Sequence, residues 1–131
     1  LAAGLLTGNI INKEDINKNQ RFSLNPEFAK RWLTEKNLVL VNELTAYAKS
    51  HGRTLLQLSI AWLLSEQSVC TVLTGASRRG HITANAEAIN WELTENEYDE
   101  ILTILEKHPS TLPDPYYSTA EYFLNNQKRK I

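Results

Sequence analysis

The sequence has 131 residues, of which 42% are hydrophobic and 22% are charged. This length and composition predict a soluble globular chain with a single hydrophobic core. The net charge of −1 excludes the broad basic field on which non-specific nucleic-acid binding depends. A membrane-spanning helix needs about 18 consecutive apolar residues, and no apolar run in the sequence approaches this length. We therefore expect neither nucleic acid nor a membrane among the partners.

Two features of the composition bear on the compartment and on the completeness of the chain. Cys70 is the only cysteine, which excludes an internal disulfide and favours a reducing, cytoplasmic compartment. Because this cysteine lies in an apolar run, we expect it to be buried by packing. The sequence contains no methionine and starts inside an apolar run at Leu1. This start predicts that the chain has been cut from a longer protein.

The first 25 residues carry weak signals. Residues 1–8 combine small and apolar side chains with two glycines, which predicts the end of a strand that passes into a loop. Gly4 and Gly8 allow a positive φ or a close approach of the backbone to a ligand. Residues 9–25 are polar and have little periodicity, so they predict a long surface loop that includes Phe22.

Capping residues and helical spacing predict five helices further along the chain. Asn25 followed by Pro26 is typical of a helix start, and His51 followed by Gly52 is typical of a helix end. Threonine followed three residues later by glutamine or glutamate forms a capping box at two places. The predicted helices cover residues 26–32, 35–50, 54–65, 79–89 and 94–108.

One strand stands out among these helices. Val69–Thr74 is rich in β-branched residues, and the alternation of strand and helix around it is typical of a parallel α/β fold. Parallel strands need further strands and cover on both faces, so we expect the chain to be part of a larger α/β protein. On its own it would leave Ile60, Trp62 and Leu64 without partners and would fold poorly or self-associate.

The end of this strand is the best candidate for a binding site. Val72–Arg79 changes from apolar residues to a glycine, two small residues and two arginines. Backbone N–H groups at a helix start, together with guanidinium groups, suit a phosphate. An ordinary turn with solvent-exposed arginines remains the alternative. A DNA-binding helix-turn-helix over residues 54–89 is disfavoured, because a strand intervenes and the chain is slightly acidic.

Several segments in register are similar to a known family. The run Leu1-Ala2-Ala3-Gly4-Leu5-Leu6-Thr7-Gly8, the spaced Arg21, residues 54–64, and Leu73-Thr74-Gly75-Ala76-Ser77 with Asn85 downstream resemble the C-terminal part of aldo-keto reductases. The resemblance covers residues 1–108, and 109–131 would be a C-terminal tail over a surface. It implies an α/β chain that is a C-terminal fragment of a (β/α)₈ TIM barrel, mostly helical with one or two short parallel strands. It also implies binding of NADPH at the C-terminal ends of the barrel strands.

The resemblance implies these cofactor-binding residues: Leu1, Ala2, Ala3, Gly4, Arg21, Gly75, Ala76, Ser77, Arg78, His81 and Asn85. The first four correspond to backbone contacts with the cofactor pyrophosphate, and Arg21 lies on the loop that folds over the cofactor. The turn at residues 75–77, with Arg78 beside it, corresponds to the site of the adenosine 2′-phosphate, which predicts a preference for NADPH over NADH. Asn85 corresponds to the partner of the adenine. His81 can donate one hydrogen bond, or it is an ordinary surface histidine.

The sequence departs from the family pattern in two ways. The family often has lysine at the position of Asn9, glutamine or arginine at that of His81, and glutamate at that of Ala84. Each of these differences would weaken the cofactor site. Carbonyl reduction in the family also needs a tyrosine, lysine, histidine and aspartate, and all four belong to sequence that would precede Leu1. We therefore expect no catalytic residue and no metal site in this chain.

These observations predict the NADP-binding C-terminal segment of an aldo-keto reductase, a class of oxidoreductase that reduces aldehydes or ketones with NADPH. As this chain alone it would be inactive, so whether it acts as an enzyme stays open. Its expected partners are NADPH, a carbonyl substrate in the intact enzyme, and either the missing N-terminal barrel half or a second copy of itself. A non-catalytic interaction module of the same fold is the alternative, because the family also includes channel-associated subunits.

Overall fold

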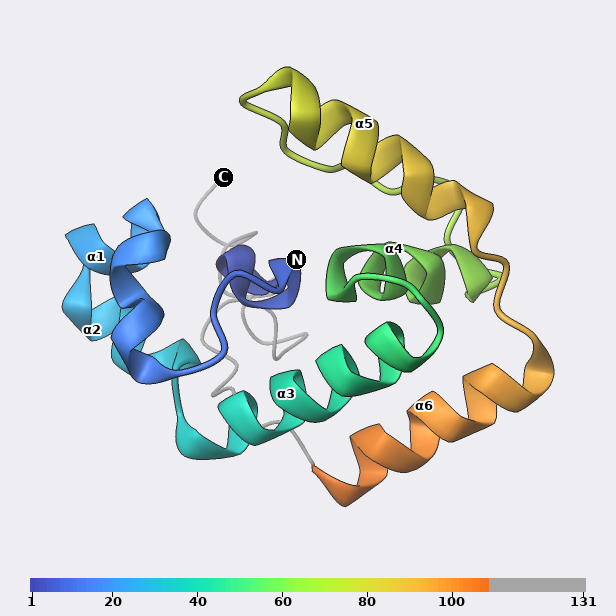
Figure 1. Cartoon of the computed structure of the whole chain (residues 1–131), viewed down its shortest axis with the longest axis horizontal. Coiled ribbons are helices and arrows are strands. Elements are labelled where there is room, and N and C mark those ends of the chain that lie inside the picture. Colours follow the sequence, from blue (N-terminus) through green and yellow to red (C-terminus); the bar gives the residue numbers. More distant parts are fainter. Residues whose placement is uncertain (109–131) are drawn as a thin grey trace, which may run out of the picture.

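A computed structural model describes residues 1–108, apart from the side chains of Gln20 and Arg21. The predicted tail at residues 109–131 lies outside this range. The described part is a chain of helical elements folded around α4 (Figure 1). In order they are η1 (Ala2–Thr7), η2 (Lys13–Lys18), α1 (Gln20–Leu24), α2 (Pro26–Trp32), α3 (Glu35–Ser50), α4 (Leu55–Ser65), α5 (Arg79–Glu87), η3 (Ala88–Asn90) and α6 (Glu95–Lys107).

Helix α4 is the centre of the fold and contacts η1, α3, α5 and η3. Its sequence is apolar almost all round, so it must be covered on several sides. Of the three residues expected to lack partners, Ile60 is in fact buried, and the Trp62 ring stacks on Tyr98 with the ring centres 4.4 Å apart. Leu64 remains exposed, as expected. Contacts with neighbouring helices thus cover much of a surface that the sequence predicts to lack partners.

The starts of four of the predicted helices are confirmed by their caps. The side chains of Asn25, Thr34, Thr54 and Thr94 each accept a hydrogen bond from the backbone N–H three residues later. Thr54 and Thr94 form complete capping boxes with the glutamine and glutamate that follow them. Gly52 has a φ of 67°, as the end of α3 requires. Local hydrogen bonding therefore sets most of the helix boundaries.

Residues 9–25 are not the long surface loop that the sequence predicts. They form η2 and α1, and the side chain of Phe22 is completely buried. The Phe22 ring packs on Phe28 with the ring centres 5.8 Å apart. Asn12 and Asp15 form a capping box that starts η2. The short helical turns are anchored by one aromatic residue, and such an anchor leaves no periodic pattern in the sequence.

The predicted strand at Val69–Thr74 is also absent, since the structure assigns no strand within residues 1–108. Residues 69–76 run without regular secondary structure beside α5 (Figure 1). A strand needs a neighbouring strand for its ladder of hydrogen bonds, and the described part of the chain provides none. Cys70, expected to be buried, is exposed for the same reason. The mostly helical character is confirmed, but the one or two parallel strands are not.

The helix predicted over residues 79–89 ends earlier, at Glu87, and continues as the short turn η3. Its expected apolar face is largely uncovered, with Ile82 61% and Ile89 62% exposed. Ala88 is buried where η3 packs against α4. Among residues 1–108, no helix has the length and apolar character needed to cross a bilayer.

Candidate cofactor-binding site

The N-terminal turn has an unusual backbone. Ala2 and Ala3 have φ values of 48° and 58°, and Gly4 has a φ of 103°. The Leu1 carbonyl accepts hydrogen bonds from the N–H groups of Gly4 at 2.9 Å and Leu6 at 3.3 Å. A left-handed conformation costs an L-residue about 1–2 kcal/mol. Two such alanines in succession are the kind of backbone strain that clusters at binding sites.

Asn19 holds this turn in place. Its side-chain amide donates to the Ala3 carbonyl at 3.0 Å, across sixteen residues of sequence. A Cβ atom added at Gly4 would lie only 2.3 Å from the same amide nitrogen, so the Asn19 side chain would have to move, and the φ of 103° would be strained for any other residue. Sequence reasoning missed Asn19, because an asparagine in a polar stretch gives no signal of its partner. Arg21 follows it in α1, and the Arg21 side chain lies outside the described part.

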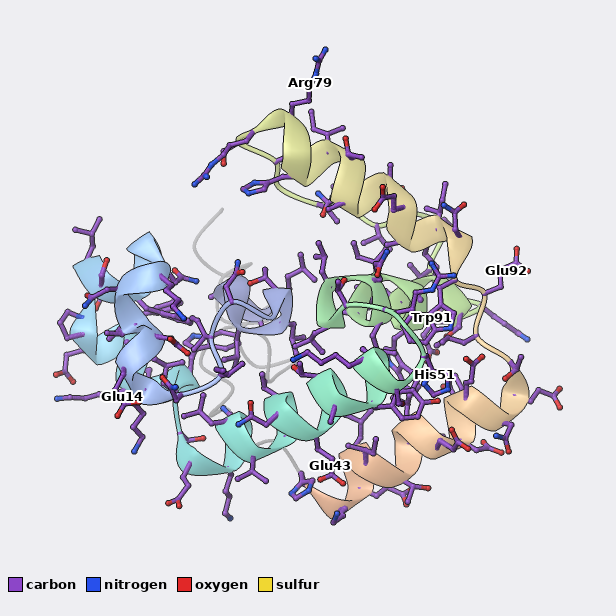
Figure 2. The ribbon with its side chains drawn as sticks, viewed as in Figure 1. Glu14, Glu43, His51, Arg79, Trp91 and Glu92 are labelled. Carbon is purple, nitrogen blue, oxygen red and sulfur yellow. The ribbon has the colours of Figure 1, made fainter. Side chains whose placement is uncertain are left out.

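The second group of predicted residues lies at the start of α5. Arg78 is the N-cap residue but makes no side-chain capping bond, and the first turn carries no acidic residue. The Ser77 hydroxyl and the His81 Nδ1 lie 3.5 Å apart. All three side chains are exposed. Figure 2 shows the neighbouring Arg79 pointing away from the rest of the chain. This end therefore combines hydroxyl, imidazole and guanidinium groups with the positive end of a helix dipole.

Helix α4 connects the two groups of predicted residues. Both η1 and α5 pack against it, and α4 and α5 begin toward the same side in Figure 1. Gly75 and Ala76 are exposed in the segment before α5, and Asn85 is half-buried further along this helix. The structure thus brings Ser77, Arg78 and His81 together. It attaches them and the N-terminal turn to one common helix.

The donor set at the start of α5 fits a phosphate. Arginine binds phosphate through paired N–H groups, and serine and histidine can each add a hydrogen bond. Phosphate also suits the N-terminus of a helix, and α5 is long enough to carry a dipole. These residues could hold the phosphate of a dinucleotide. Within residues 1–108, no group of His, Cys, Asp or Glu side chains is placed to hold a metal ion.

The two described tyrosines each donate a hydrogen bond to a glutamate. The Tyr47 hydroxyl donates to Glu100 at 2.9 Å, and the Tyr98 hydroxyl donates to Glu66 at 2.7 Å. Burial and the Glu100 carboxylate raise the pKa of Tyr47 far above its usual range, and the hydrogen bond to Glu66 raises the pKa of Tyr98. Both hydroxyls hold their protons more tightly than a free tyrosine, whereas a catalytic acid must give its proton up. The remaining tyrosines lie outside the described residues.

A separate apolar cavity of about 300 Å³ lies between η1, α3, α4 and α6. Leu1 is the one predicted cofactor-binding residue in its lining, which otherwise comes mainly from leucines. Ser59 also lines it, but its hydroxyl already donates to the Leu55 carbonyl at 2.8 Å. The cavity has no polar group placed for a phosphate, so it is distinct from the site at the start of α5.

Comparison with known proteins identifies the family. The sequence profile of the Aldo/keto reductase family matches residues 1–106. The chain is 35% identical over 92 residues to the L-glyceraldehyde 3-phosphate reductase of Escherichia coli O157:H7, which covers 69% of this chain and 27% of that protein. It is 31% identical over 116 residues to aldo-keto reductase YhdN of Bacillus subtilis (strain 168), covering 88% of this chain and 34% of that protein.

A third relative is named as a channel subunit and not as a reductase. The chain is 37% identical over 120 residues to a probable voltage-gated potassium channel subunit beta of Arabidopsis thaliana, covering 88% of this chain and 36% of that protein. These alignments span between 27% and 36% of the relatives' lengths. The family match extends over most of this sequence. The chain therefore belongs to the aldo/keto reductase family.

Proposed function

We propose that this chain is the NADP-binding C-terminal segment of an aldo-keto reductase, and that it has no reductase activity alone. In the intact enzyme the bound NADPH would supply the hydride for an aldehyde or ketone. The residues of this chain would hold the cofactor. The N-terminal turn would bind the pyrophosphate through its backbone, and the start of α5 would bind the adenosine 2′-phosphate.

The observation that carries this proposal is the arrangement at the start of α5. Ser77, Arg78 and His81 are exposed at a helix N-terminus that lacks a side-chain cap and an acidic residue. An exposed set of this kind attracts an anion with two or more negative charges. Membership of the family makes a nicotinamide dinucleotide the ligand to test first. The strained turn at Ala2 and Ala3 is the second support.

The test is a direct titration of the full chain with NADPH and with NADH. Quenching of tryptophan fluorescence or calorimetry measures the binding. We expect saturable binding of NADPH and at least tenfold weaker binding of NADH, because NADH lacks the 2′-phosphate. Equal affinity for the two cofactors would contradict the assignment of the 2′-phosphate site. No binding of either would contradict the proposal as a whole.

The lack of activity is tested separately, by following NADPH oxidation with a simple aldehyde. We expect no turnover above the rate without protein, because neither Tyr47 nor Tyr98 is placed as an acid. Turnover proportional to chain concentration would overturn this part of the proposal. Such turnover would not contradict the proposed cofactor site.

A second function is favoured by the relative named as a potassium channel subunit beta, which aligns with 88% of this chain. In that case the chain would be an interaction module that keeps the family fold without catalysis. The two candidates differ in what they require of the site at the start of α5. Cofactor binding needs Arg78 and Ser77, whereas binding to a partner protein need not involve them.

A further inference from the structure

We propose that Asn19 is a positioning residue of the cofactor site, which joins the N-terminal turn to the start of α1, the helix that contains Arg21. The inference rests on the proposed function, because it adds a residue to the same site. The side-chain nitrogen and oxygen of Asn19 bond to two different parts of the chain. This one side chain therefore controls how both segments are presented to a dinucleotide.

The side-chain oxygen of Asn19 fixes the start of α1. Oδ1 accepts a hydrogen bond from the backbone N–H of Phe22, three residues later, at 3.3 Å. The backbone carbonyl of Asn19 accepts from the N–H groups of Phe22 and Ser23, both at 3.0 Å. These bonds are typical of an asparagine at the N-cap of a helix. Because Phe22 is completely buried, the start of α1 is anchored in the core, and Asn19 with it.

The side-chain nitrogen of Asn19 fixes the N-terminal turn. Nδ2 donates to the Ala3 carbonyl at 3.0 Å. This carbonyl and the Gly4 N–H belong to one planar trans peptide unit, in which they point in opposite directions. Holding the carbonyl therefore also holds the Gly4 N–H, which donates to the Leu1 carbonyl at 2.9 Å. The closed turn from Leu1 to Gly4 depends on the Asn19 amide in this way.

The turn needs such support from outside, because its backbone is unfavourable. The φ values of Ala2 and Ala3 are positive, and a conformation of this kind persists only where the surrounding structure determines it. The Thr7 hydroxyl donates to the Gly4 carbonyl at 2.7 Å, but Thr7 belongs to the same short element, η1. Asn19 is instead anchored at a different helix. Without its amide we expect the turn to relax, so that its N–H groups lose the orientation that the pyrophosphate requires.

Asn19→Ser separates the two hydrogen bonds of this side chain. Serine caps a helix about as well as asparagine, so the start of α1 should be kept. The serine hydroxyl is too short to reach the Ala3 carbonyl as well. Asn25→Ser is the matched control, because the exposed Asn25 caps α2 by accepting from the Phe28 N–H at 3.0 Å. Both variants should keep the helical circular dichroism spectrum of the wild type.

The experiment is titration of the full chain with NADPH, NADH and adenosine 2′,5′-bisphosphate. The bisphosphate carries the 2′-phosphate, but it has a single 5′-phosphate in place of the pyrophosphate. We expect Asn19→Ser to weaken the binding of both dinucleotides by a similar factor, at least fivefold, and that of the bisphosphate by less than twofold. Asn25→Ser should weaken the binding of none of the three.

The outcomes that overturn the positioning role differ from those that overturn the proposed function. If the wild type binds NADPH and Asn19→Ser binds it equally well, Asn19 does not position the site. Equal weakening of all three ligands would also overturn the role, because it would show a general loss of structure. If the wild type binds neither dinucleotide, the proposed function fails, and the role of Asn19 fails with it.

Amide hydrogen exchange provides a second measurement that needs no ligand. The Gly4 amide should exchange at least tenfold faster in Asn19→Ser than in the wild type, because its hydrogen bond to Leu1 is no longer held. The Phe22 amide should keep its protection, since serine still caps α1. Equal protection of the Gly4 amide in both proteins would show that Asn19 does not hold the turn.

Discussion

Gly4 shows how a single residue sets the geometry of the N-terminal turn. Its φ of 103° is available to glycine, and the Asn19 amide occupies the space that a side chain would need. The same amide supports the Ala3 carbonyl. The sequence predicts that Gly4 allows a positive φ or a close approach to a ligand, and the structure confirms the positive φ. The role of Asn19 could not be predicted from the sequence, because the contact between Gly4 and Asn19 depends on how η2 and α1 fold.

Replacing Gly4 with alanine should destabilise the chain by roughly 1–3 kcal/mol, the cost of a strained backbone plus the displacement of Asn19. Gly80→Ala is the matched control, because a Cβ atom at Gly80 meets nothing within 4 Å. It should be neutral or stabilising by up to about 1 kcal/mol, since alanine favours a helix. Urea denaturation followed by circular dichroism compares the two. Equal stability of both variants would show that the turn is not constrained as described.

Arg78 is the residue at which the two cofactors should be distinguished. Its side chain makes no capping bond and is exposed, so its removal should leave the fold unchanged. We expect Arg78→Ala to weaken NADPH at least tenfold in the titration described above and to change NADH less than twofold. Arg31→Ala, which removes an exposed arginine from α2, should change neither. A similar loss for both cofactors would place Arg78 away from the 2′-phosphate.

Helices α3 and α6 run antiparallel and are joined near both ends by polar contacts (Figure 2). At one end the Tyr47 hydroxyl donates to Glu100 at 2.9 Å, and His51 Nε2 lies 3.9 Å from Glu97 Oε1. At the other end Glu43 accepts from Lys107 at 2.7 Å and pairs with His108. Both histidines cap the ends of their helices, as the sequence predicts. Their partners on the opposite helix could not be read from the sequence.

Acid should weaken this contact. The hydrogen bond from Lys107, followed by that from His108, lowers the pKa of Glu43 below its usual 4.5. A backbone hydrogen bond from Thr94 is the main cause of the lowered pKa of Glu97. A carboxylate with a lowered pKa stabilises the fold above its unfolded pKa, and this stability is lost as the pH falls through the folded pKa. The loss should therefore begin below about pH 4.5.

Thermal unfolding at pH 6.5 and at pH 3.5 measures this effect. The melting temperature of the wild type should decrease from pH 6.5 to pH 3.5. That of Glu43→Gln should decrease by less, because this variant has no carboxylate to protonate at position 43. Glu43→Gln should also start from a lower melting temperature at pH 6.5. If the variant loses as much as the wild type on acidification, the pairs formed by Glu43 do not stabilise the folded chain.

The elements differ in how far the sequence determines them. Helices α3, α4 and α6 have local caps and a periodic apolar pattern, so their bounds follow from the sequence. Residues 69–76 have the composition of a strand, but a strand requires a partner, and the local sequence does not provide one. The opposite failure occurs at η2 and α1. Their polar sequence predicts a loop, but short helices form there and pack around the buried Phe22. Predictions failed where a contact distant in the sequence decides the structure.

At the scale of the whole chain, one helix holds both parts of the candidate site. Helix α4 contacts both η1 and α5, so the N-terminal turn and the residues that we predict to bind phosphate share one support. The site residues were inferred from resemblance and stay a prediction; the structure places Ser77, Arg78 and His81 together at one helix start. A dinucleotide bound as proposed would have to contact the N-terminal turn and the start of α5 at the same time.

Amide chemical shifts of the full chain during titration with NADP⁺ test this most directly. If both groups bind one dinucleotide, the amides of residues 2–4 and of residues 77–81 shift together, with one saturation curve. Amides of the cavity residues on α3 and α6, such as Leu44 and Ile101, should stay unchanged. Shifts at only one of the two groups, or saturation of the two at different concentrations, would show that they do not form a single cofactor site.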